Sequence, residues 1–549
     1  MLSTMQETPL LISRILEHGR RIHGRSTVTT WTGEAEPHRR TFAEIGDRAA
    51  QLAHALRDEL GVEPGSVLGT LMWNNAEHVE AYFALPSMGA ILHTLNLRLP
   101  AAQLAWIIQH AEDKVIIANG TVLPLLAPLL PQLPEVEHVV VSGAGDRSVL
   151  EGTGVRVHDY EELLAGRPTT YDWPQLDERE AAALCYTSGT TGDPKGVLYS
   201  HRSVYLHSMQ VNMTQSMGLT DRDTSLVVVP QFHVNAWGLP HATFMTGINM
   251  LMPDRFLQPA PLAEMIESER PTHAAAVPTI WQGLLAELTA KPRDVGSLGQ
   301  VTIGGSACPP ALMEAFDRLG MRVCHAWGMT ETSPLGTVAR APGTADTPEK
   351  EWRYRLTQGR FPAGVEPRLI GPNGDVLPWD GESAGELEVR GSWIAGAYFG
   401  GTDKEPVRPE DKFSPDGWLR TGDVGVISED GFLTLTDRAK DVVKSGGEWI
   451  SSVALENEIM AHPDVAEAAV IAVPDEKWGE RPLATVVLKD GATAGPAELR
   501  AFLAERVAKW QLPERWSVIE SVPKTSVGKF DKKVLRARYA EDGLDVTVL

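Results

Sequence analysis

The sequence predicts an α/β fold in two parts: a large N-terminal domain of layered α/β subdomains and a small, mobile α+β C-terminal domain. The length of 549 residues exceeds what a single hydrophobic core usually holds. Several segments share one order, a short apolar run, a Gly/Ser/Thr turn and a helical pattern, which is typical of α/β folds. A proline-studded stretch, "GGTDKEPVRPEDKFSPDGW", precedes a last part of about a hundred residues.

Four apolar runs in the middle of the chain are predicted to be buried strands whose carboxyl ends open into loops. They cover residues 224–233, 272–279, 300–310 and 321–331. Between the last two, "PPALMEAFDRLG" begins with prolines, ends at Gly320 and keeps Leu312, Ala315, Phe316 and Leu319 on one helical face. The pattern is one βαβ unit, and ligands bind at the carboxyl ends of strands in open α/β sheets.

The boundary between the two domains is expected within residues 436–441. After it we expect a helix that ends before Pro463, strands within 465–473 and 482–488, and a helix with an apolar stripe of Leu499, Phe502, Leu503 and Val507. The predicted domains are therefore residues 1–437 and 438–549.

Composition and charge exclude several classes of protein. The net charge of −22 disfavours binding to nucleic acid. No apolar stretch approaches 18 residues, so no integral membrane segment is expected, and the first 21 residues indicate an amphipathic helix rather than a secretory signal. Cys185, Cys308 and Cys324 are scattered, which favours a cytoplasmic location and small buried thiols.

The stretch "YTSGTTGDPKGV", residues 186–197, indicates a phosphate-binding loop. Its glycines allow close backbone approach, its hydroxyls donate hydrogen bonds, and Lys195 supplies positive charge. It is not a Walker A loop, because Lys195 follows Pro194 and precedes Gly196. The stretch suits a polyphosphate.

This stretch resembles the phosphate-loop signature of the adenylate-forming enzymes, the superfamily of acyl-CoA synthetases, peptide-synthetase adenylation domains and firefly-type luciferases. Six further signatures follow in the order of that family, so the resemblance spans nearly the whole chain. They are "PQFHVNAWGLP", "GGSACPP", "HAWGMTETSP", "TGD", "DRAKDVVKSGGEWIS" and "PKTSVGKFDKK".

Within the superfamily, "FHVNAWGLP" and "SGGEWISS" resemble bacterial medium- and long-chain fatty-acyl-CoA synthetases. "HAWGMTE" and "GGSACPP" also resemble the 3-methylmercaptopropionate-CoA ligase branch, and both alternatives stay open. A carrier-loading or luciferase-like enzyme would pass the same adenylate to another acceptor, such as a carrier protein or an amine. A non-enzymatic relative would keep the fold but lose the motif residues that this chain retains.

The resemblance implies a reaction in two halves, with ATP and CoA as co-substrates and Mg²⁺ as the cofactor. A carboxylate attacks the α-phosphate of ATP, giving acyl-adenylate and pyrophosphate, and the thiol of CoA then displaces AMP. The resemblance further implies a homodimer formed through the large domain.

The resemblance also assigns site residues. Mg²⁺ would be held by Thr187 and Glu331. The catalytic residues would be Lys529, Thr330, Glu331 and His233. The acid would contact His233, Trp237, Gly304, Gly305 and Trp327. The nucleotide and CoA would contact Thr187, Ser188, Gly189, Thr190, Thr191, Gly192, Lys195, Gly305, Ser306, Ala307, His325, Ala326, Trp327, Thr330, Asp423, Arg438, Lys440, Lys444 and Trp449.

Some of these residues carry more specific expectations. Lys529 would bridge the attacking carboxylate and the α-phosphate, and Lys440 occupies the hinge position of the family. Trp237 matches the residue that gates the acyl tunnel, and Trp327, bulkier than the usual Tyr, favours short to medium chains. His325 departs from the amide-type residues common at its position.

Overall fold

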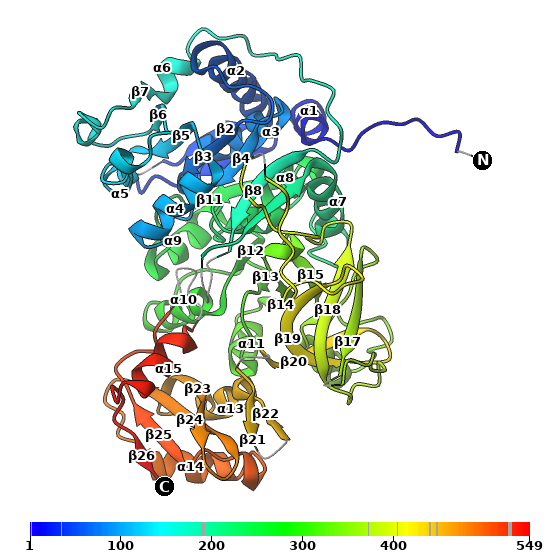
Figure 1. The fold of residues 1–549 in the computed structure, drawn as a ribbon, viewed down its shortest axis with the longest axis vertical. Helices are drawn as coiled ribbons and strands as arrows, with labels where there is room; N and C mark the ends of the chain where they lie inside the picture. The colour runs from blue at the N-terminus through cyan, green and yellow to red at the C-terminus, as the bar shows by residue number, and fades with distance from the viewer. Residues whose placement is uncertain are drawn as a thin grey trace.

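The computed structural model describes residues 1, 3–34, 36–187, 193–371, 373–402, 404–438, 441–445, 448–524 and 530–549, and for residues 437, 438, 444, 448 and 449 it describes the backbone only. The mixed α/β architecture is the predicted one, with a large N-terminal domain and a small C-terminal domain (Figure 1). No helix within the described ranges is both long and apolar enough to cross a membrane.

The first sheet of the large domain is mainly parallel and is buried on both faces. Its central strands are buried at every position, because alternate residues enter different cores: Ile117 and Val140 pack into one cluster, Ile116 and Val139 into another. In spatial order its strands are β7 (Arg156–Asp159), β6 (His138–Ser142), β5 (Val115–Asn119), β3 (Val67–Leu71), β4 (Ile91–Thr94), β8 (Ala181–Tyr186) and β9 (Gly196–Ser200).

The helices of this region include the predicted amphipathic helix at the start of the chain, α1 (Ile12–Ile22). The next helix, α2 (Phe42–Leu60), begins at a capping box. The Thr41 hydroxyl accepts a hydrogen bond from the backbone N–H of Glu44, and the Glu44 carboxylate accepts one from the backbone N–H of Thr41. The other helices of this region are α3 (Ala76–Ser87), α4 (Ala101–Ala111), η1 (Gly120–Val122), α5 (Leu123–Leu126), η2 (Leu130–Gln132), η3 (Arg147–Leu150) and α6 (Tyr160–Leu164).

The second sheet of the large domain changes from parallel to antiparallel pairing along its width. The four predicted strands are present as β10 (Thr224–Val227), β12 (His273–Ala276), β13 (Gln300–Ile303) and β14 (Arg322–Gly328), all parallel. On one side they continue into β11 (Asn249–Met252), β1 (Thr27–Thr30) and β2 (His38–Thr41), and on the other into β15 (Leu335–Val338), β16 (Gly359–Arg360), β20 (Phe432–Arg438), β19 (Leu419–Ile427), β18 (Gly385–Gly391) and β17 (Val365–Ile370).

The predicted βαβ unit is confirmed: β13 and β14 pair in parallel and are connected by α11 (Pro310–Arg318), which buries Leu312, Ala315 and Phe316. The prediction was wrong for Leu319, which follows the end of the helix and is exposed. This arrangement brings the carboxyl ends of β10, β12, β13 and β14 to one edge of the sheet. The remaining helices of the domain are α7 (His201–Asn212), η4 (Val234–Gly238), α8 (Leu239–Thr246), α9 (Pro259–Glu269), α10 (Pro278–Ala290), η5 (Thr330–Thr332) and α12 (Pro348–Arg355).

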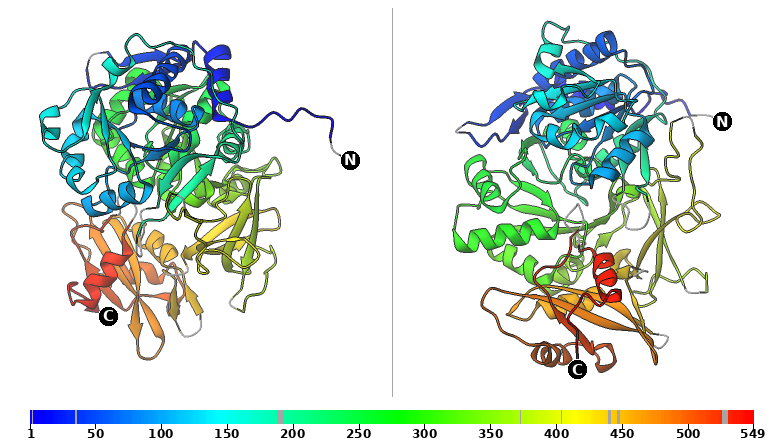
Figure 2. Two further views of the ribbon diagram at one scale, coloured as in Figure 1. Left: turned by 45° about the horizontal axis from the view of Figure 1, so that its top comes forward. Right: turned by 60° about the vertical axis from the view of Figure 1, so that its left-hand side comes forward.

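The small domain forms one end of the molecule, drawn from orange to red and adjoining the green segment that carries α10 and α11 (Figures 1 and 2). The chain passes from β20 in the large sheet to β21 in a third sheet, and the predicted helices and strands follow as α13, β23, β24 and α14. Its elements are β21 (Val443–Ser445), β22 (Glu448–Ile450), α13 (Ser452–Met460), β23 (Val465–Asp475), β24 (Gly479–Leu488), α14 (Pro496–Ala504), η6 (Lys509–Gln511), β25 (Arg515–Val518), α15 (Lys532–Ala540) and β26 (Thr547–Val548).

Candidate active site

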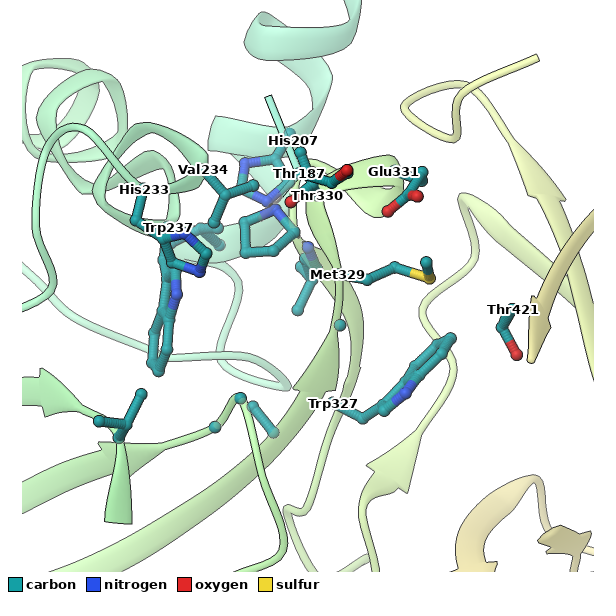
Figure 3. Close-up of a pocket in the computed structure, with 18 of the residues that line it drawn as sticks. Thr187, His207, His233, Val234, Trp237, Trp327, Met329, Thr330, Glu331 and Thr421 are labelled. Atoms are coloured by element: carbon teal, nitrogen blue, oxygen red, sulfur yellow. Dashed lines mark hydrogen bonds between the residues drawn. The ribbon is translucent and has the colours of Figure 1, made fainter. Parts of the chain in front are cut away.

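A cavity of the large domain, which we call the main cavity, has a volume of about 220 Å³ and lies at the carboxyl ends of the parallel strands. Figure 3 shows Trp237 and Trp327 on opposite sides of it, with Thr187, Thr330 and Glu331 along its upper edge. The cavity therefore unites residues that the sequence analysis assigned to the metal, the nucleotide and the acid. Of the predicted residues, its lining includes Thr187, Lys195, His233, Trp237, Gly304, Gly305, Ala326, Trp327, Thr330 and Glu331.

Thr187 and Lys195, in the predicted phosphate-binding stretch, are hydrogen-bonded to each other. The backbone N–H of Thr187 donates to the carbonyl of Lys195 at 2.9 Å, and the N–H of Lys195 donates to the Thr187 hydroxyl at 3.2 Å. The Lys195 ammonium lies 5.1 Å from the centre of the Tyr398 ring, where the ring quadrupole attracts it. A hydroxyl and a cation thus face the cavity from one loop.

Glu331 lies in η5 and is only 5% exposed, and its carboxylate is held in place by a hydrogen bond. The Tyr398 hydroxyl donates to Oε1 of Glu331 at 2.7 Å, while the Tyr199 hydroxyl donates to the carbonyl of Thr330 at 2.7 Å. Burial, together with the neighbouring Glu331 charge, raises the pKa of Tyr398, so its hydroxyl remains a donor. The sequence analysis missed both tyrosines because neither stands in a recognised motif.

Glu331 and Thr187 fit magnesium as a pair of hard oxygen ligands. The described ranges contain no group of three or more His, Cys, Asp or Glu side chains that could hold a metal by themselves. Magnesium usually needs only one or two protein carboxylates, since waters and substrate phosphates complete its octahedral shell. The donor set suits an ion that arrives with a nucleotide.

Asp423, which the resemblance assigns to the nucleotide as the carboxylate that would accept from the ribose hydroxyls, is 3% exposed and lies in β19. The indole Nε1 of Trp327 donates to Oδ2 of Asp423 at 2.8 Å, and the Asp423 backbone N–H donates to the Thr421 hydroxyl at 3.1 Å. Trp327, in β14, therefore contacts both the acid side of the cavity and the residue assigned to the nucleotide.

A second cavity of about 310 Å³ lies between the two domains. On the large domain it is lined by residues that the sequence analysis assigned to the nucleotide, and on the small domain by charged and uncharged side chains of α13, α15 and nearby residues. Among the latter, the Lys532 ammonium pairs with Glu456 at 2.6 Å. The large domain contributes Gly305, Ser306, Ala307, His325, Ala326, Trp327 and Asp423, and the small domain contributes Asp441, Glu456, Asp531, Lys532, Lys533 and Arg536, among others.

His325 lines this second cavity as a neutral ring. Burial lowers its pKa to about 4. Its Nδ1 lies 2.9 Å from the carbonyl of Thr357, and because a carbonyl only accepts, Nδ1 carries the proton and donates. The ring is thus anchored to the main chain. The amide side chains that are common at this position in the family could donate the same hydrogen bond.

His233 and Trp237 are positioned by a left-handed turn. Val234 to Gly238 all have positive φ, from 41° to 75°, a conformation that costs non-glycine residues about 1–2 kcal/mol each. Oδ1 of Asn235 accepts from the Cys185 thiol at 3.2 Å and from the Tyr82 hydroxyl at 3.4 Å, which compensates part of this cost. All three cysteines are buried, as expected.

Gly304 permits the close approach of the Trp237 ring to β13. A Cβ added at Gly304 would lie 3.2 Å from Cη2 of Trp237. Beyond the ring, the cavity continues as a mainly apolar arm, which we call the acyl arm. It is lined by His207, Val211, Ser216, Met217, Val277, Thr302, Leu335 and Val338.

The sequence analysis identified none of these arm residues. Their spacing fits an ordinary core, and only the fold brings α7, α10, β13 and β15 around one space. Of the predicted residues, Ser188, Gly189, Thr190, Thr191, Gly192, Lys440 and Lys529 lie outside the described residues, as do the side chains of Arg438, Lys444 and Trp449.

The chain folds into a large and a small domain, with one cavity in the large domain and a second between the two, and comparison with known proteins identifies the family. The model of the AMP-binding enzyme family matches residues 17–399, and that of the AMP-binding enzyme C-terminal domain matches residues 454–529. The chain belongs to the AMP-binding enzyme family.

Similar proteins cover nearly the whole chain. A 3-methylmercaptopropionyl-CoA ligase of Ruegeria pomeroyi is 44% identical, covering 98% of this chain and 99% of its own. A medium-chain-fatty-acid–CoA ligase of Ectopseudomonas oleovorans is 42% identical, with 98% of each chain covered. Among solved structures, an anthranilate CoA ligase in complex with anthranoyl-AMP is 26% identical with a TM-score of 0.85, covering 98% of this chain and 99% of that chain.

Proposed function

We propose that the protein is an AMP-forming, ATP-dependent acyl-CoA ligase that activates a carboxylic acid as its acyl-adenylate and transfers the acyl group to CoA. One observation carries the proposal: a single cavity is lined by residues of the predicted phosphate-binding loop, by the buried Glu331 carboxylate and by the mainly apolar arm. The two similar enzymes named above, both CoA ligases, support the same activity.

The proposed substrate is a fatty acid of short to long chain, with 3-methylmercaptopropionate as the alternative. The two similar ligases are named for 3-methylmercaptopropionate and for medium-chain fatty acids, and both kinds of acid suit the mainly apolar arm. An acceptor other than CoA, such as a carrier protein or an amine, would use the same first half-reaction.

In the first half-reaction the acid carboxylate would attack the α-phosphorus, and the bond to pyrophosphate would break. Catalysis of this kind depends on positioning and electrostatic stabilisation. Magnesium, when bound by Glu331 and Thr187, would neutralise charge on the phosphate oxygens. Thr330 would donate to the α-phosphate, and His233 would border the carboxylate. Lys195 would approach the departing pyrophosphate.

Lys529 would supply the cation between the carboxylate and the α-phosphate. On either side of its segment, Lys524 and Phe530 form an antiparallel bridge next to the cavity between the domains. Lys529→Ala should therefore block adenylation while sparing thioester formation from supplied acyl-adenylate. Equal loss of both half-reactions, measured with purified acyl-adenylate, would contradict this role.

In the second half-reaction the thiol sulfur of CoA would attack the acyl carbonyl carbon, and AMP would leave as the carbon–oxygen bond breaks. We propose a domain boundary between residues 437 and 438 and a hinge at Lys440, about which the small domain would turn to present Lys444 and Trp449. The last strand of the large sheet, β20, ends at Arg438 and the first strand of the small sheet, β21, begins at Val443, which supports a boundary near this point.

CoA-dependent AMP release with propionate, 3-methylmercaptopropionate, octanoate, palmitate and cinnamate tests the proposal. Activity that peaks at octanoate or palmitate would identify a fatty-acyl-CoA ligase, and a peak at the thioether acid would identify the alternative. AMP release that needs an amine or a carrier protein instead of CoA would overturn the choice of acceptor, and no acid-dependent release at all would overturn the activity.

Two further properties are proposed. The three buried free thiols support a cytoplasmic location, since such thiols persist in a reducing compartment. The resemblance to fatty-acyl-CoA synthetases supports a homodimer, which light scattering tests by mass: a monomer in solution would refute it.

A further inference from the structure

The acyl arm runs along β13 toward the start of that strand. Gln300 and Thr302 lie on one face of β13, because alternate residues of a strand share a face, and Gly304 directly follows the end of the strand. Gly304 lies beside Trp237 at the arm's entrance, and Thr302 lines the arm farther in. Gln300 is therefore placed at the far end of the arm.

A short segment that follows α7, residues 213–219, closes this end. Ser216 and Met217 line the arm and are only 2% and 6% exposed. The segment folds back on the helix: the Met217 N–H donates to the Val211 carbonyl at 3.1 Å, and the Gly218 N–H donates to the Met213 carbonyl at 3.1 Å.

Two side chains from other elements fix this segment, and we call them the Arg340–Gln300 clasp. Nη2 of Arg340 donates to the Met217 carbonyl at 2.5 Å and to Oε1 of Gln300 at 2.7 Å, and Nε of Arg340 donates to the Ser216 carbonyl. Nε2 of Gln300 donates to the Met217 carbonyl at 3.0 Å. The carbonyls of both residues that close the arm are thus bound.

The clasp makes strong hydrogen bonds, and its two side chains are partly exposed to solvent. A guanidinium stays charged at all accessible pH values, and its planar fork can bind several acceptors at once. Arg340 is partly exposed, whereas Ser216 and Met217 behind it are buried. If the clasp were released, the segment would be free to move outward and the arm would lengthen toward solvent.

We propose that the Arg340–Gln300 clasp determines the acyl-chain length that the enzyme accepts, by holding residues 213–219 as the closed end of the arm. The substrate class is then a short, unbranched acid whose tail ends at Met217. This inference rests on the proposed acyl-CoA ligase activity and assigns chain-length selection to residues that do not contact the acid.

The test compares wild-type protein, Arg340→Ala and Gln300→Ala on straight-chain acids from propionate to dodecanoate, by CoA-dependent AMP release. Relative to the wild type, the preferred length should rise by about two carbons in Arg340→Ala, with the selectivity for the longer acid gaining about tenfold. Gln300→Ala should shift the preferred chain length in the same direction by a smaller amount. If Arg340→Ala fails to fold, the result for Gln300→Ala alone tests the role of the clasp. Arg293→Ala, which removes an ion pair with Glu267 on the surface of α9, is the matched control.

Amide hydrogen exchange adds a readout that does not depend on the acid. Exchange within residues 213–219 should accelerate in Arg340→Ala while the KM for ATP stays unchanged. An unchanged chain-length profile in folded variants would overturn the inference, even if the wild type is an active ligase. Absence of acid-dependent AMP release in the wild type would instead overturn the proposed function on which the inference rests.

Discussion

The two ends of the main cavity are built by different means. At the end assigned to the nucleotide, polar groups are fixed by specific partners: Glu331 is held by Tyr398, and Asp423, in the second cavity, is held by Trp327. The acyl arm is lined mostly by apolar side chains, and its far end depends on a loop clasped from outside. From this difference we expect the rate of the reaction to depend on the first end and the choice of acid to depend on the second.

The largest expected effect comes from removing charge at the nucleotide end. Glu331→Gln keeps the size of the side chain but loses its negative charge, so the rate of acid-dependent exchange of pyrophosphate into ATP should fall by roughly 10²–10³-fold. The exposed Glu349→Gln in α12 is the control.

A fall of less than about threefold in Glu331→Gln would show that the carboxylate is not part of the reacting site. A changed preference among acids in Glu331→Gln would contradict the assignment of acid selection to the other end of the cavity.

A smaller effect is expected from Trp327→Phe, which keeps most of the ring packing but removes the donor to Asp423. Hydrogen bonds to charged groups contribute about 1.5–3 kcal/mol, so the KM for ATP should rise by about tenfold while the ranking of acids stays the same. Trp173→Phe removes a similar bond, from Nε1 to Glu17 at 3.1 Å, away from both cavities and serves as the control.

If Trp327→Phe changes the ranking of acids and leaves the KM for ATP unaltered, Trp327 acts as a wall of the acyl arm. Isothermal titration with AMP separates the two outcomes without turnover.

The smallest expected effect concerns stability and pH. Burial lowers the pKa of His273, which contacts Thr302 behind the arm, to about 4, against an ordinary value of 6.5. The unfolded chain then binds a proton that the folded protein does not, so this histidine's contribution is complete above pH 6.5 and is lost as pH falls toward 4. Between pH 6.5 and 5 the loss should be roughly 1.5 kcal/mol.

His273→Asn should flatten the pH dependence of the free energy of unfolding in that window, measured by urea titration, with the exposed His38→Asn as control. An unchanged slope in His273→Asn would mean that the histidine titrates in the folded protein as it does in the unfolded chain.

The sequence predicted the nucleotide end of the cavity far better than the acyl arm. Thr187, Glu331 and Trp327 stand in contiguous motifs, because phosphate and metal chemistry constrains residue types at fixed positions along the chain. The strands and the helix of the βαβ unit were also predicted, since their periodicity is local. Met217, Thr302 and Arg340 come together only through packing of α7, β13 and the segment after β15, and no local pattern records that contact.

Single-turnover analysis tests the central claim most directly. Enzyme in excess over the best acid of the panel would be mixed with ATP, quenched, and analysed for acyl-adenylate and acyl-CoA by mass spectrometry, with and without CoA. The account predicts that acyl-adenylate accumulates without CoA and disappears into acyl-CoA when CoA is present. Two results would contradict it. One is acyl-CoA formation in the reaction with CoA while no acyl-adenylate is detectable in the reaction without CoA. The other is acyl-adenylate that CoA does not consume.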